Sequence, residues 1–284
     1  SSIIFKMMFG ATCFLILGVI DDLVELDAIK RLIIEFLLVY LFIRPDLVIN
    51  TLTFSTNSII GYSLTFPNLL AILLTALWII GFTNAINWID GIDGLATGIT
   101  LILTLQLIFL SIITGNTVII ILLASLLGSC ISFLFFNKFP SKIIMGDGGS
   151  HFIGFILSTA TLVVFSNIGF SDLNKIVSSN DYKNIFYLSP GIIVFLMPVF
   201  EMFIVIVNRI RNKFPIIYGD RSHLHYKLID SGLTEDKTAK LICAGYLFVA
   251  GISLLSFSKI ISLIYFLVSV PFLSKKIYQI KKFY

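Results

Sequence analysis

The sequence predicts an all-α integral membrane protein in which about nine transmembrane helices form one bundle, with a small extracytoplasmic β-hairpin near residues 46–66. The 284-residue chain is 57% hydrophobic and 13% charged, whereas soluble domains carry roughly a quarter charged residues. Its mean hydropathy is +1.01, and apolar runs of spanning length recur along the whole chain. A water-soluble globule is excluded because too little polar surface is available to cover it. We therefore expect residues 1–284 to form a single membrane-embedded domain.

Candidate transmembrane segments follow from the length of the apolar runs, since a spanning helix needs about 20 mostly apolar residues, within a range of roughly 17–25. They cover residues 3–20, 31–44, 67–86, 95–114, 117–136, 150–167, 187–207, 239–256 and 258–274. The second is short, and Gly115-Asn116 alone separates the fourth from the fifth, which indicates a tight hairpin. Residues 46–66 are rich in β-branched side chains and alternate loosely, which favours a small hairpin outside the membrane.

The distribution of Lys and Arg among the loops predicts the orientation of the chain, because cytoplasmic loops carry an excess of both. If the loop that holds Asp21-Asp22 is cytoplasmic, the alternation of successive spans also places four further segments on that side. These are residues 87–94, 137–149, 208–238 and the C-terminal tail. Most of the 20 Lys and Arg residues then lie there. The opposite side keeps Arg44, Lys175, Lys183 and Lys259, with Lys6 near its edge. We therefore expect a multi-pass protein of the inner (plasma) membrane whose polar motifs face the cytoplasm.

The first polar motif is the pair Asp21-Asp22, where an apolar helix ends in two adjacent carboxylates. Adjacent aspartates repel each other and attract a cation or a proton between them. A polar pair that ends a span at the headgroups explains the motif equally well. Asp27 is expected to cap the next helix, with Lys30 and Arg31 in its first turn. Because cations at a helix N-terminus are unfavourable, they suggest an anionic partner such as a phosphate, although the excess of positive charge inside explains them almost as well.

The second polar motif lies between two apolar spans, where Asn84, Asn87, Asp90 and Asp93 recur at every third position. In a helix, each step of three residues turns the chain by about 300°. The row therefore drifts slowly around one side, and its polar groups converge towards one cavity. Polar residues at membrane depth are costly and usually functional. A solvated turn is the alternative interpretation, but two acids and two amides in so short a stretch make it the weaker one.

The third polar motif places Asp147 just before a predicted span, among Gly146, Gly148 and Gly149, which allow a ligand to approach the backbone closely. Carboxylate oxygens suit Mg²⁺, which typically takes one or two protein groups together with substrate phosphates and water. The N-terminus of the following helix offers free N–H groups to a phosphate. Taken alone, an aspartate cap followed by flexible glycines explains this motif better.

The fourth polar motif is Asp220–Lys227, within a basic loop that begins near Asn208. Residues two apart share a side only in an extended chain, so His223 and His225 indicate an irregular or strand-like loop. A zinc site would need more ligands, and no cysteine is placed to supply them. Contacts to phosphate oxygens fit better, with Arg221 as the forked donor. Taken alone, the motif is also explained by a surface loop bound to anionic lipid headgroups.

Together and in this order, the four motifs resemble those of the polyprenyl-phosphate N-acetylhexosamine-1-phosphate transferases, the superfamily that includes the MraY, WecA and TagO enzymes. The resemblance spans roughly residues 9–235 and covers four separate cytoplasmic loops, so the combination is far more specific than any one motif. The His-Leu-His sequence at 223–225 is similar to the WecA/TagO branch, because MraY relatives carry a run of consecutive histidines there.

The resemblance implies roles for individual residues. Asn87 and Asp147 match the Mg²⁺ ligands of the family, with Mn²⁺ as the alternative ion. Catalytic roles are implied for Asp21, Asp22, Asp90, Asp93, His223 and His225. Substrate contacts are implied for Lys30 at the phosphates and for Gly91, Asp93 and Asn137 at the nucleoside. The aspartate pair matches one proposed either to bind metal or to deprotonate the acceptor, and a metal or electrostatic role is favoured because a lipid phosphate is already ionised at neutral pH.

Several positions depart from the family pattern. Tyr226 replaces a further histidine found in many WecA-like chains, and Glu201 replaces the aspartate common in that branch. Ile144 occupies the position at which MraY relatives place an aromatic side chain against uracil. The front end differs most, because the family usually begins with one or two more spans and a cytoplasmic loop containing Thr-Pro. We therefore expect that this chain is N-terminally truncated.

The resemblance implies a Mg²⁺-dependent enzyme that transfers N-acetylhexosamine-1-phosphate from a UDP-sugar to undecaprenyl or another polyprenyl phosphate and releases UMP. This reaction would be the first membrane step of cell-envelope glycan synthesis, for the cell wall or for lipopolysaccharide. The expected partners are these two substrates, the lipid bilayer and a second copy of the chain in a homodimer, and not nucleic acid. An inactive, truncated homologue that acts as a membrane scaffold is the first alternative. An ion-coupled transporter is the second, but it would place its acids within spans, where only Glu35 and Glu201 lie.

Overall fold

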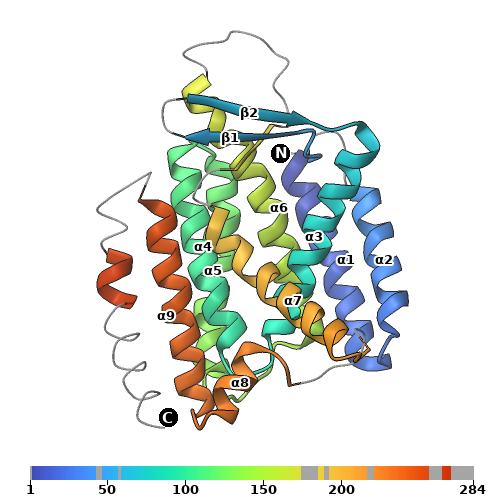
Figure 1. The fold of residues 1–284 in the computed structure, drawn as a ribbon, viewed down its shortest axis with the longest axis vertical. Coiled ribbons are helices and arrows are strands. Elements are labelled where there is room, and N and C mark those ends of the chain that lie inside the picture. The colour runs from blue at the N-terminus through green and yellow to red at the C-terminus, as the bar shows by residue number, and fades with distance from the viewer. Residues whose placement is uncertain are drawn as a thin grey trace. The chain divides into compact units, whose positions relative to one another are not determined.

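The computed structural model describes residues 2–42, 47–56, 59–173, 185–188, 192–215, 221–255 and 264–269 (Figure 1). Its helices are α1 (Ser2–Val24), α2 (Ala28–Phe42), α3 (Asn68–Ile89), α4 (Leu95–Ile113), α5 (Thr117–Asn137), α6 (Gly146–Leu173), α7 (Ile193–Arg211), α8 (Leu224–Asp230) and α9 (Glu235–Leu254). Its strands are β1 (Thr51–Thr56), β2 (Ile59–Thr65) and β3 (Ile185–Leu188). A further helical segment covers residues 264–269. The predicted all-α membrane class is confirmed.

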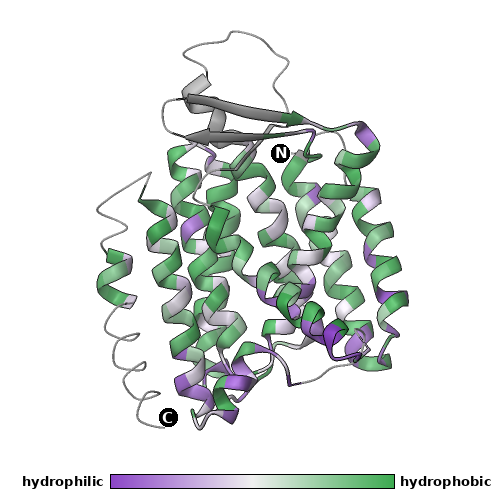
Figure 2. Ribbon diagram, in the orientation of Figure 1, coloured by the Kyte–Doolittle hydropathy of each residue, from purple (hydrophilic) through white to green (hydrophobic). Residues whose placement is uncertain are grey.

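Seven helices in the described part of the chain, α1, α3, α4, α5, α6, α7 and α9, are long and apolar enough to cross a membrane. Hydrophobic residues cover these helices over most of their length (Figure 2). The short second segment of the predicted set corresponds to α2, which has 15 residues. The last predicted segment, 258–274, lies largely outside the described residues.

The chain forms two compact units, and several helices contribute to both. The first unit contains Ser1–Asn84, Thr104–Leu127 and Gly146–Ser189, and the second contains Ala85–Leu103, Gly128–Met145 and Pro190–Tyr284. Helices α1, α2 and α6 and the three strands therefore belong to the first unit, whereas α7, α8 and α9 belong to the second. That the whole chain forms one domain remains a prediction.

In the first unit, α1 packs along α6 through glycines and aromatic rings. The rings of Phe14 and Phe155 lie 4.7 Å apart, and a Cβ atom on Gly10 would lie 2.5 Å from the Phe155 ring. Gly154 of α6 approaches α3 in the same way, since its Cβ atom would lie 2.6 Å from Thr83 Cα. Small residues at these points let the helix backbones come close, which is the usual device for packing helices in a membrane.

A three-stranded sheet in the order β2-β1-β3 also belongs to the first unit. β1 pairs antiparallel with β2, with Thr51 opposite Thr65, and parallel with β3, with Thr51 opposite Ile185. The hairpin predicted near 46–66 is confirmed, while its extracytoplasmic location remains a prediction. Residues 187 and 188 were expected in a span, but pairing with β1 brings them into the sheet, and α7 begins only at Ile193.

In the second unit, α9 packs against both α7 and α8. Glu235 and Asp236 lie in the first turn of α9, where negative charge is favourable to the helix dipole. Gly98 of α4 lies close to Cys243 of α9, since a Cβ atom on the glycine would lie 2.7 Å from the Cys243 Sγ atom. These contacts support α8, the short helix that contains His225.

We expect Gly154→Ala to lower the melting temperature of the detergent-solubilised protein, because overpacking a tight contact typically costs about 1–3 kcal/mol. Gly245→Ala in α9 is the matched control, since a Cβ atom there meets nothing within 4 Å and alanine has the higher helix propensity by about 1 kcal/mol. Melting followed by fluorescence-detected size exclusion measures both variants. An unchanged melting temperature in Gly154→Ala would contradict the close approach of α6 to α3.

Candidate active site

Asp21, near the end of α1, forms an ion pair with Arg31 of α2. Its Oδ2 atom accepts a hydrogen bond from Arg31 Nη1 at 2.5 Å, and its Oδ1 atom accepts one from the backbone N–H of Leu26 at 2.8 Å. Only 7% of the Asp21 side chain is exposed, and an ion pair shielded from water interacts more strongly than an exposed one. Both bonds hold the beginning of α2 against the end of α1.

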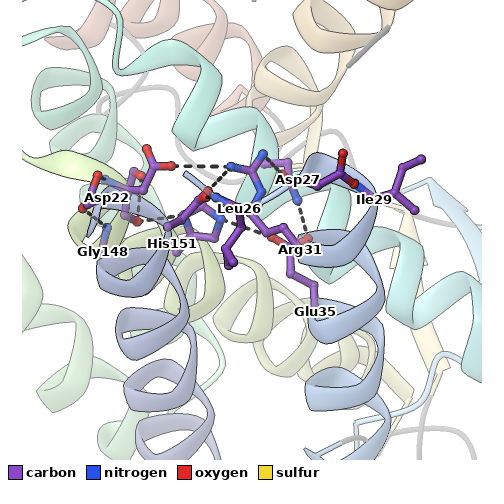
Figure 3. Close-up of polar contacts among 12 residues, drawn as sticks. Asp22, Leu26, Asp27, Ile29, Arg31, Glu35, Gly148 and His151 are labelled. Atoms are coloured by element: carbon purple, nitrogen blue, oxygen red, sulfur yellow. Dashed lines mark hydrogen bonds and ion pairs between the residues drawn. The ribbon is translucent and has the colours of Figure 1, made fainter. Parts of the chain in front are cut away.

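Asp22, the next residue, turns to α6 instead (Figure 3). Its Oδ1 atom accepts the backbone N–H of Asp147 at 3.0 Å, and its Oδ2 atom accepts that of Gly148 at 3.2 Å. The first N–H groups of a helix have no partner within the helix, and the positive end of the helix dipole favours a carboxylate there. The expectation that these N–H groups are free for a phosphate is therefore wrong for Asp147 and Gly148, because Asp22 occupies them.

Two glycines make the contact between α1 and α6 sterically feasible. A Cβ atom on Gly18 of α1 would collide with the carbonyl group of Asp147. Gly146 begins α6 with a φ of 68°, a left-handed conformation that glycine adopts without a steric cost. The first and third polar motifs therefore meet, and their glycines serve the approach of one helix to another.

Arg31 lies among the polar groups of the first unit. Besides Asp21, its Nη1 atom lies 3.5 Å from Asp147 Oδ2, and its Nη2 atom lies 3.4 Å from Asn84 Oδ1. The cation in the first turn of α2 thus has anionic partners within the protein itself. Arg31 links α2 to three other helices, α1, α3 and α6, through charge-assisted hydrogen bonds, which are stronger than bonds between neutral groups.

Asp27 caps the first turn of α2, as predicted. Its Oδ1 atom accepts the N–H groups of Ile29 at 3.0 Å and of Lys30 at 3.3 Å. The side chain of Lys30, which the resemblance assigns to the phosphates, is exposed. Arg31 rather than Lys30 is therefore the residue that contacts the carboxylates.

A buried network lies one helical turn beyond Arg31 and Asp147 (Figure 3). The side chains of Glu35 and His151 are both 0% exposed, and Glu35 Oε1 lies 3.1 Å from His151 Nε2. Glu35 Oε2 accepts a hydrogen bond from Asn84 Nδ2 at 2.6 Å, and His151 Nδ1 lies 2.7 Å from the backbone oxygen of Asp147. The network therefore joins α2, α3 and α6 to Asp147.

Arg31, Glu35 and His151 were not predicted as site residues, although the sequence contains signals for them. Arg31 and Glu35 are four residues apart on α2, and Asp147 and His151 are four apart on α6, so each pair lies on one helix face. An acid inside an otherwise apolar helix, such as Glu35, is a second signal, because such residues are costly and usually functional.

In the second unit, Asp93 and Asn137 hold the loop that follows α5. Asp93 Oδ2 accepts the backbone N–H of Ser141 at 2.9 Å. Asn137 Oδ1 accepts the hydroxyl of Thr97 at 2.8 Å, and Asn137 Nδ2 donates to the carbonyl oxygen of Ile143 at 3.0 Å. Two of the three predicted nucleoside residues thus shape one loop, while nucleoside binding itself remains a prediction.

The two predicted histidines lie against the second acidic motif. His223 meets Trp88 edge to face, with ring centroids 5.5 Å apart, and stacks on His225 at 5.4 Å. A Cβ atom on Gly91 would collide with His225 Nε2, and Tyr226 donates its hydroxyl to the Gly91 carbonyl at 3.3 Å. The second unit therefore brings the histidine motif and the turn after α3 together.

His225 is a buried imidazole that stays neutral at physiological pH. Desolvation by burial, together with the neighbouring His223, lowers its pKa to about 4. Among the residues that the structure describes, neither ring nitrogen of His225 has a hydrogen-bond partner. A neutral imidazole offers one donor and one acceptor, and both lie buried beside Gly91 and His223.

The backbone of the histidine motif differs from the strand-like loop that was predicted. His223 is extended, with φ −65° and ψ 151°, but α8 begins at the next residue and contains His225. The two rings still stack because His223 is the N-cap residue of α8 and His225 lies in its first turn. Glu201 of α7 accepts the N–H of Leu224 at 3.3 Å and so fixes the start of α8.

Two arginines flank the histidine motif in different ways. Arg221, predicted as a phosphate donor, is 64% exposed and pairs with Asp230 at 2.9 Å. The guanidinium of Arg209, which was not predicted, lies 5.0 Å from the Trp88 ring centroid, and only 4% of the residue is exposed. Arg209 is therefore the buried cation beside the ring that contacts His223.

The two predicted metal ligands belong to different units, Asn87 to the second and Asp147 to the first. Asn87, near the end of α3, and Asp90, in the turn that follows, are both partly exposed. The side chain of Asp147 is 33% exposed. Over the described ranges, no three His, Cys, Asp or Glu side chains are grouped so that they could hold a metal ion. The joint role of Asn87 and Asp147 remains a prediction.

Comparisons with known proteins identify relatives of this chain. The family described as Glycosyl transferase family 4 matches residues 4–166. The probable undecaprenyl-phosphate N-acetylglucosaminyl 1-phosphate transferase of Bacillus subtilis is 32% identical over 242 residues, which are 84% of this chain and 62% of that protein. The decaprenyl-phosphate N-acetylglucosaminephosphotransferase of Mycobacterium leprae is 32% identical over 189 residues, 61% of this chain and 44% of that protein. A phospho-N-acetylmuramoyl-pentapeptide-transferase of Clostridioides difficile is 40% identical over 97 residues, 32% of this chain and 30% of that protein. The chain thus spans less than two thirds of the length of these relatives.

We expect Asp22→Ala to lower the free energy of unfolding by about 1 kcal/mol, because two N–H groups of α6 lose their acceptor. Asp22→Asn should cost less, since its amide oxygen still accepts one of them. The control is Asp230→Ala, which removes an exposed ion pair worth about 0–1 kcal/mol. Thermal melts in detergent compare the three variants. If Asp22→Ala costs no more than Asp230→Ala, the capping contact is wrong.

The depressed pKa of His225 predicts a pH-dependent stability. Between the ordinary pKa of 6.5 and the folded value of about 4, the unfolded chain binds more protons, so stability is lost as the pH falls through this range. His225→Gln removes this loss, and we expect its melting temperature to fall less than that of the wild type between pH 7 and about pH 4. Circular dichroism melts at a series of pH values measure both proteins. If the melting temperatures of the two proteins fall equally with pH, a buried, neutral His225 is contradicted.

Proposed function

This chain belongs to glycosyl transferase family 4, and we propose from this premise that it transfers an N-acetylhexosamine-1-phosphate group from a UDP-sugar to a polyprenyl phosphate and releases UMP. The relatives from Bacillus subtilis and Mycobacterium leprae are named for N-acetylglucosamine phosphate transfer to undecaprenyl phosphate and decaprenyl phosphate. The observation that carries the proposal is the polar cluster at the junction of α1, α2 and α6, in which Asp21 and Asp147 share Arg31. Charged groups gathered at the ends of apolar helices suit chemistry on a phosphate that is attached to a lipid.

The proposed reaction is a displacement at phosphorus. An oxygen of the lipid phosphate attacks the β-phosphorus of the UDP-sugar and forms a new P–O bond. The bond from that phosphorus to the bridging oxygen breaks, and the bridging oxygen leaves with the electron pair as part of UMP. A phosphate monoester with a second pKa of about 6 is mostly ionised at neutral pH, so no protein base has to remove a proton. The task of the chain is to align two anions and to offset their charge.

Asn87 and Asp147 are the residues that we propose hold a Mg²⁺ ion, or Mn²⁺ in its place. Both offer oxygen atoms, which these hard cations prefer as ligands. The Asp147 carboxylate is 33% exposed, so it is accessible to an ion even though Arg31 lies nearby. When bound, the ion neutralises charge on the transferring phosphates. Its other ligands would be substrate phosphates and water.

The remaining polar residues are assigned supporting roles in this proposal. Asp22 positions the N-terminal turn of α6, and Asp21 holds Arg31, so neither acts as a base on the acceptor. Exposed Lys30 binds a phosphate. Gly91, Asp90, Asp93 and Asn137 serve the nucleotide end, and His223 and His225 bind phosphate oxygens. Arg209 supports the histidines through Trp88.

We further propose that the protein lies in the inner membrane with the site on the cytoplasmic face. The support is the position of the basic residues, which cytoplasmic segments carry in excess. Arg209 and Arg211 end α7, and Lys30 and Arg31 begin α2 on the same predicted side as the polar motifs.

The proposal is tested by transfer in membranes that contain residues 1–284. We incubate them with Mg²⁺, undecaprenyl phosphate and, separately, radiolabelled UDP-N-acetylglucosamine and UDP-N-acetylgalactosamine. At least one donor should give lipid-linked radioactivity and an equal amount of UMP. A lipid-linked product also separates an enzyme from a scaffold or an ion-coupled transporter, because neither of these forms one.

Matched variants test the assigned residues in the same assay. Asp147→Ala should lower the rate by about 100-fold or more, as expected when a group that stabilises charge in the transition state is lost. The exposed Asp230→Ala should leave the rate unchanged. If no donor gives product while the Bacillus subtilis relative is active in the same membranes, the proposed function is overturned. Wild-type turnover by Asp147→Ala would overturn its assignment alone.

A further inference from the structure

Helix α2 contacts the rest of the first unit through both polar and apolar side chains, the latter including Phe42, whose ring lies 5.4 Å from that of Phe9. The buried residues of α2 are Glu35 and Val39, and large apolar residues elsewhere on it are exposed, including Ile29, Ile33, Leu37, Tyr40 and Leu41. Arg31, Glu35 and Val39 follow one another at intervals of four residues, so one face of the helix makes these contacts. Arg31 and Glu35 therefore lie on the same face of α2.

The hydrogen bonds around Glu35 assign an orientation to each partner. A backbone carbonyl only accepts, so His151 Nδ1, which lies 2.7 Å from the Asp147 carbonyl oxygen, is a donor. His151 Nε2 lies 3.1 Å from Glu35 Oε1, within hydrogen-bond distance. Asn84 Nδ2 donates to Glu35 Oε2 at 2.6 Å, which leaves Asn84 Oδ1 facing Arg31 Nη2 at 3.4 Å.

We propose that Glu35, Asn84 and His151 are positioning residues that fix α2 and thereby keep the Arg31 guanidinium beside Asp147. Their network reaches Asp147 by two routes, through its backbone carbonyl from His151 and through its carboxylate from Arg31. Because a buried polar group without a partner is costly, the satisfied arrangement strongly favours one position of α2. The proposal deepens the proposed transfer reaction and rests on it, since Asp147, the partner of Arg31, is assigned to that reaction.

Two substitutions of Glu35 separate hydrogen bonding from the filling of space. Glu35→Gln preserves the network, because its oxygen accepts from Asn84 Nδ2 and its amide donates to His151 Nε2, the acceptor of a ring protonated on Nδ1. Glu35→Met has a similar unbranched length but leaves Asn84 and His151 without their partner. Thr75→Val is the matched control. It removes a buried hydroxyl of α3 that lies outside the network and accepts the N–H of Ile49 at 2.9 Å.

The position of α2 is measured by double electron–electron resonance between spin labels at Leu37 of α2 and Leu69 of α3, which are 58% and 80% exposed. The native cysteines, Cys13, Cys130 and Cys243, are first replaced by serine or alanine. We expect one narrow distance distribution for the wild type, Glu35→Gln and Thr75→Val, and a broader or shifted one for Glu35→Met. A wild-type distribution in Glu35→Met would overturn the proposal, and so would a Glu35→Gln distribution as broad as that of Glu35→Met.

Transfer kinetics of the unlabelled proteins test the link to the reaction. We expect Glu35→Met to lower kcat at least about tenfold with little change in the KM for the UDP-sugar, because misplaced groups lose transition-state stabilisation. Glu35→Gln and Thr75→Val should stay within about threefold of the wild type. A displaced α2 with unchanged kcat would overturn the positioning role.

Two further controls keep the result interpretable. If Glu35→Met is not monodisperse, Asn84→Ala removes the side chain that contacts both Glu35 and Arg31, and its kcat should also fall; a wild-type kcat would overturn the proposal. If the wild type forms no lipid-linked product, the proposed function fails by itself. The spin-label distances still decide whether the network fixes α2, because they do not depend on turnover.

Discussion

The carboxylate of Asp22 binds the first N–H groups of α6, and the arrangement of the first unit depends on this contact. The first N–H groups of a helix lack a partner within the helix, and the positive end of the helix dipole favours a carboxylate there. Asp22 supplies that partner from α1, and Gly18 lets the two backbones come close enough. Once α6 begins at this point, Asp147 falls in its first turn and His151 lies one turn later, next to Glu35. A shift of one residue would rotate both side chains by about 100° and separate them from their partners.

Both acids that lie within predicted spans have a hydrogen-bonding role in the fold. Glu35 contacts His151 and Asn84, and Glu201 accepts the N–H group that begins α8. In an ion-coupled transporter, such acids would bind the coupling ion on its way through the membrane. Here each acid holds another element in place, α2 in the first unit and the histidine motif in the second. The acids at helix ends, in contrast, are the ones that meet a cation or remain partly exposed, which favours chemistry at the helix ends over passage through the helices.

Features set by short stretches of chain could be predicted from the sequence, and features set by distant contacts could not. The length of the apolar runs gives most of the helices, and the Asp27 cap needs only the residues beside it. The adjacency of Asp21 and Asp22 suggests a shared cation, but Asp21 contacts Arg31 and Asp22 accepts an N–H group of α6. The excess of positive charge in cytoplasmic segments also accounts for Arg31, so the sequence does not indicate its contacts with Asp21 and Asp147. β3 left no local signal because it pairs with a strand far away in the sequence. The spacing of His223 and His225 misled because α8 begins between them.

The charge of the first cluster bears on the proposal that the reaction uses a cation. The groups in contact comprise the carboxylates of Asp21, Asp22 and Asp147 and the guanidinium of Arg31. The N-terminal dipole of α6 offsets roughly half a charge at Asp22. An excess of more than one negative charge remains, and it would repel an approaching diphosphate. A divalent cation at the exposed face of Asp147, as we propose, would offset that excess.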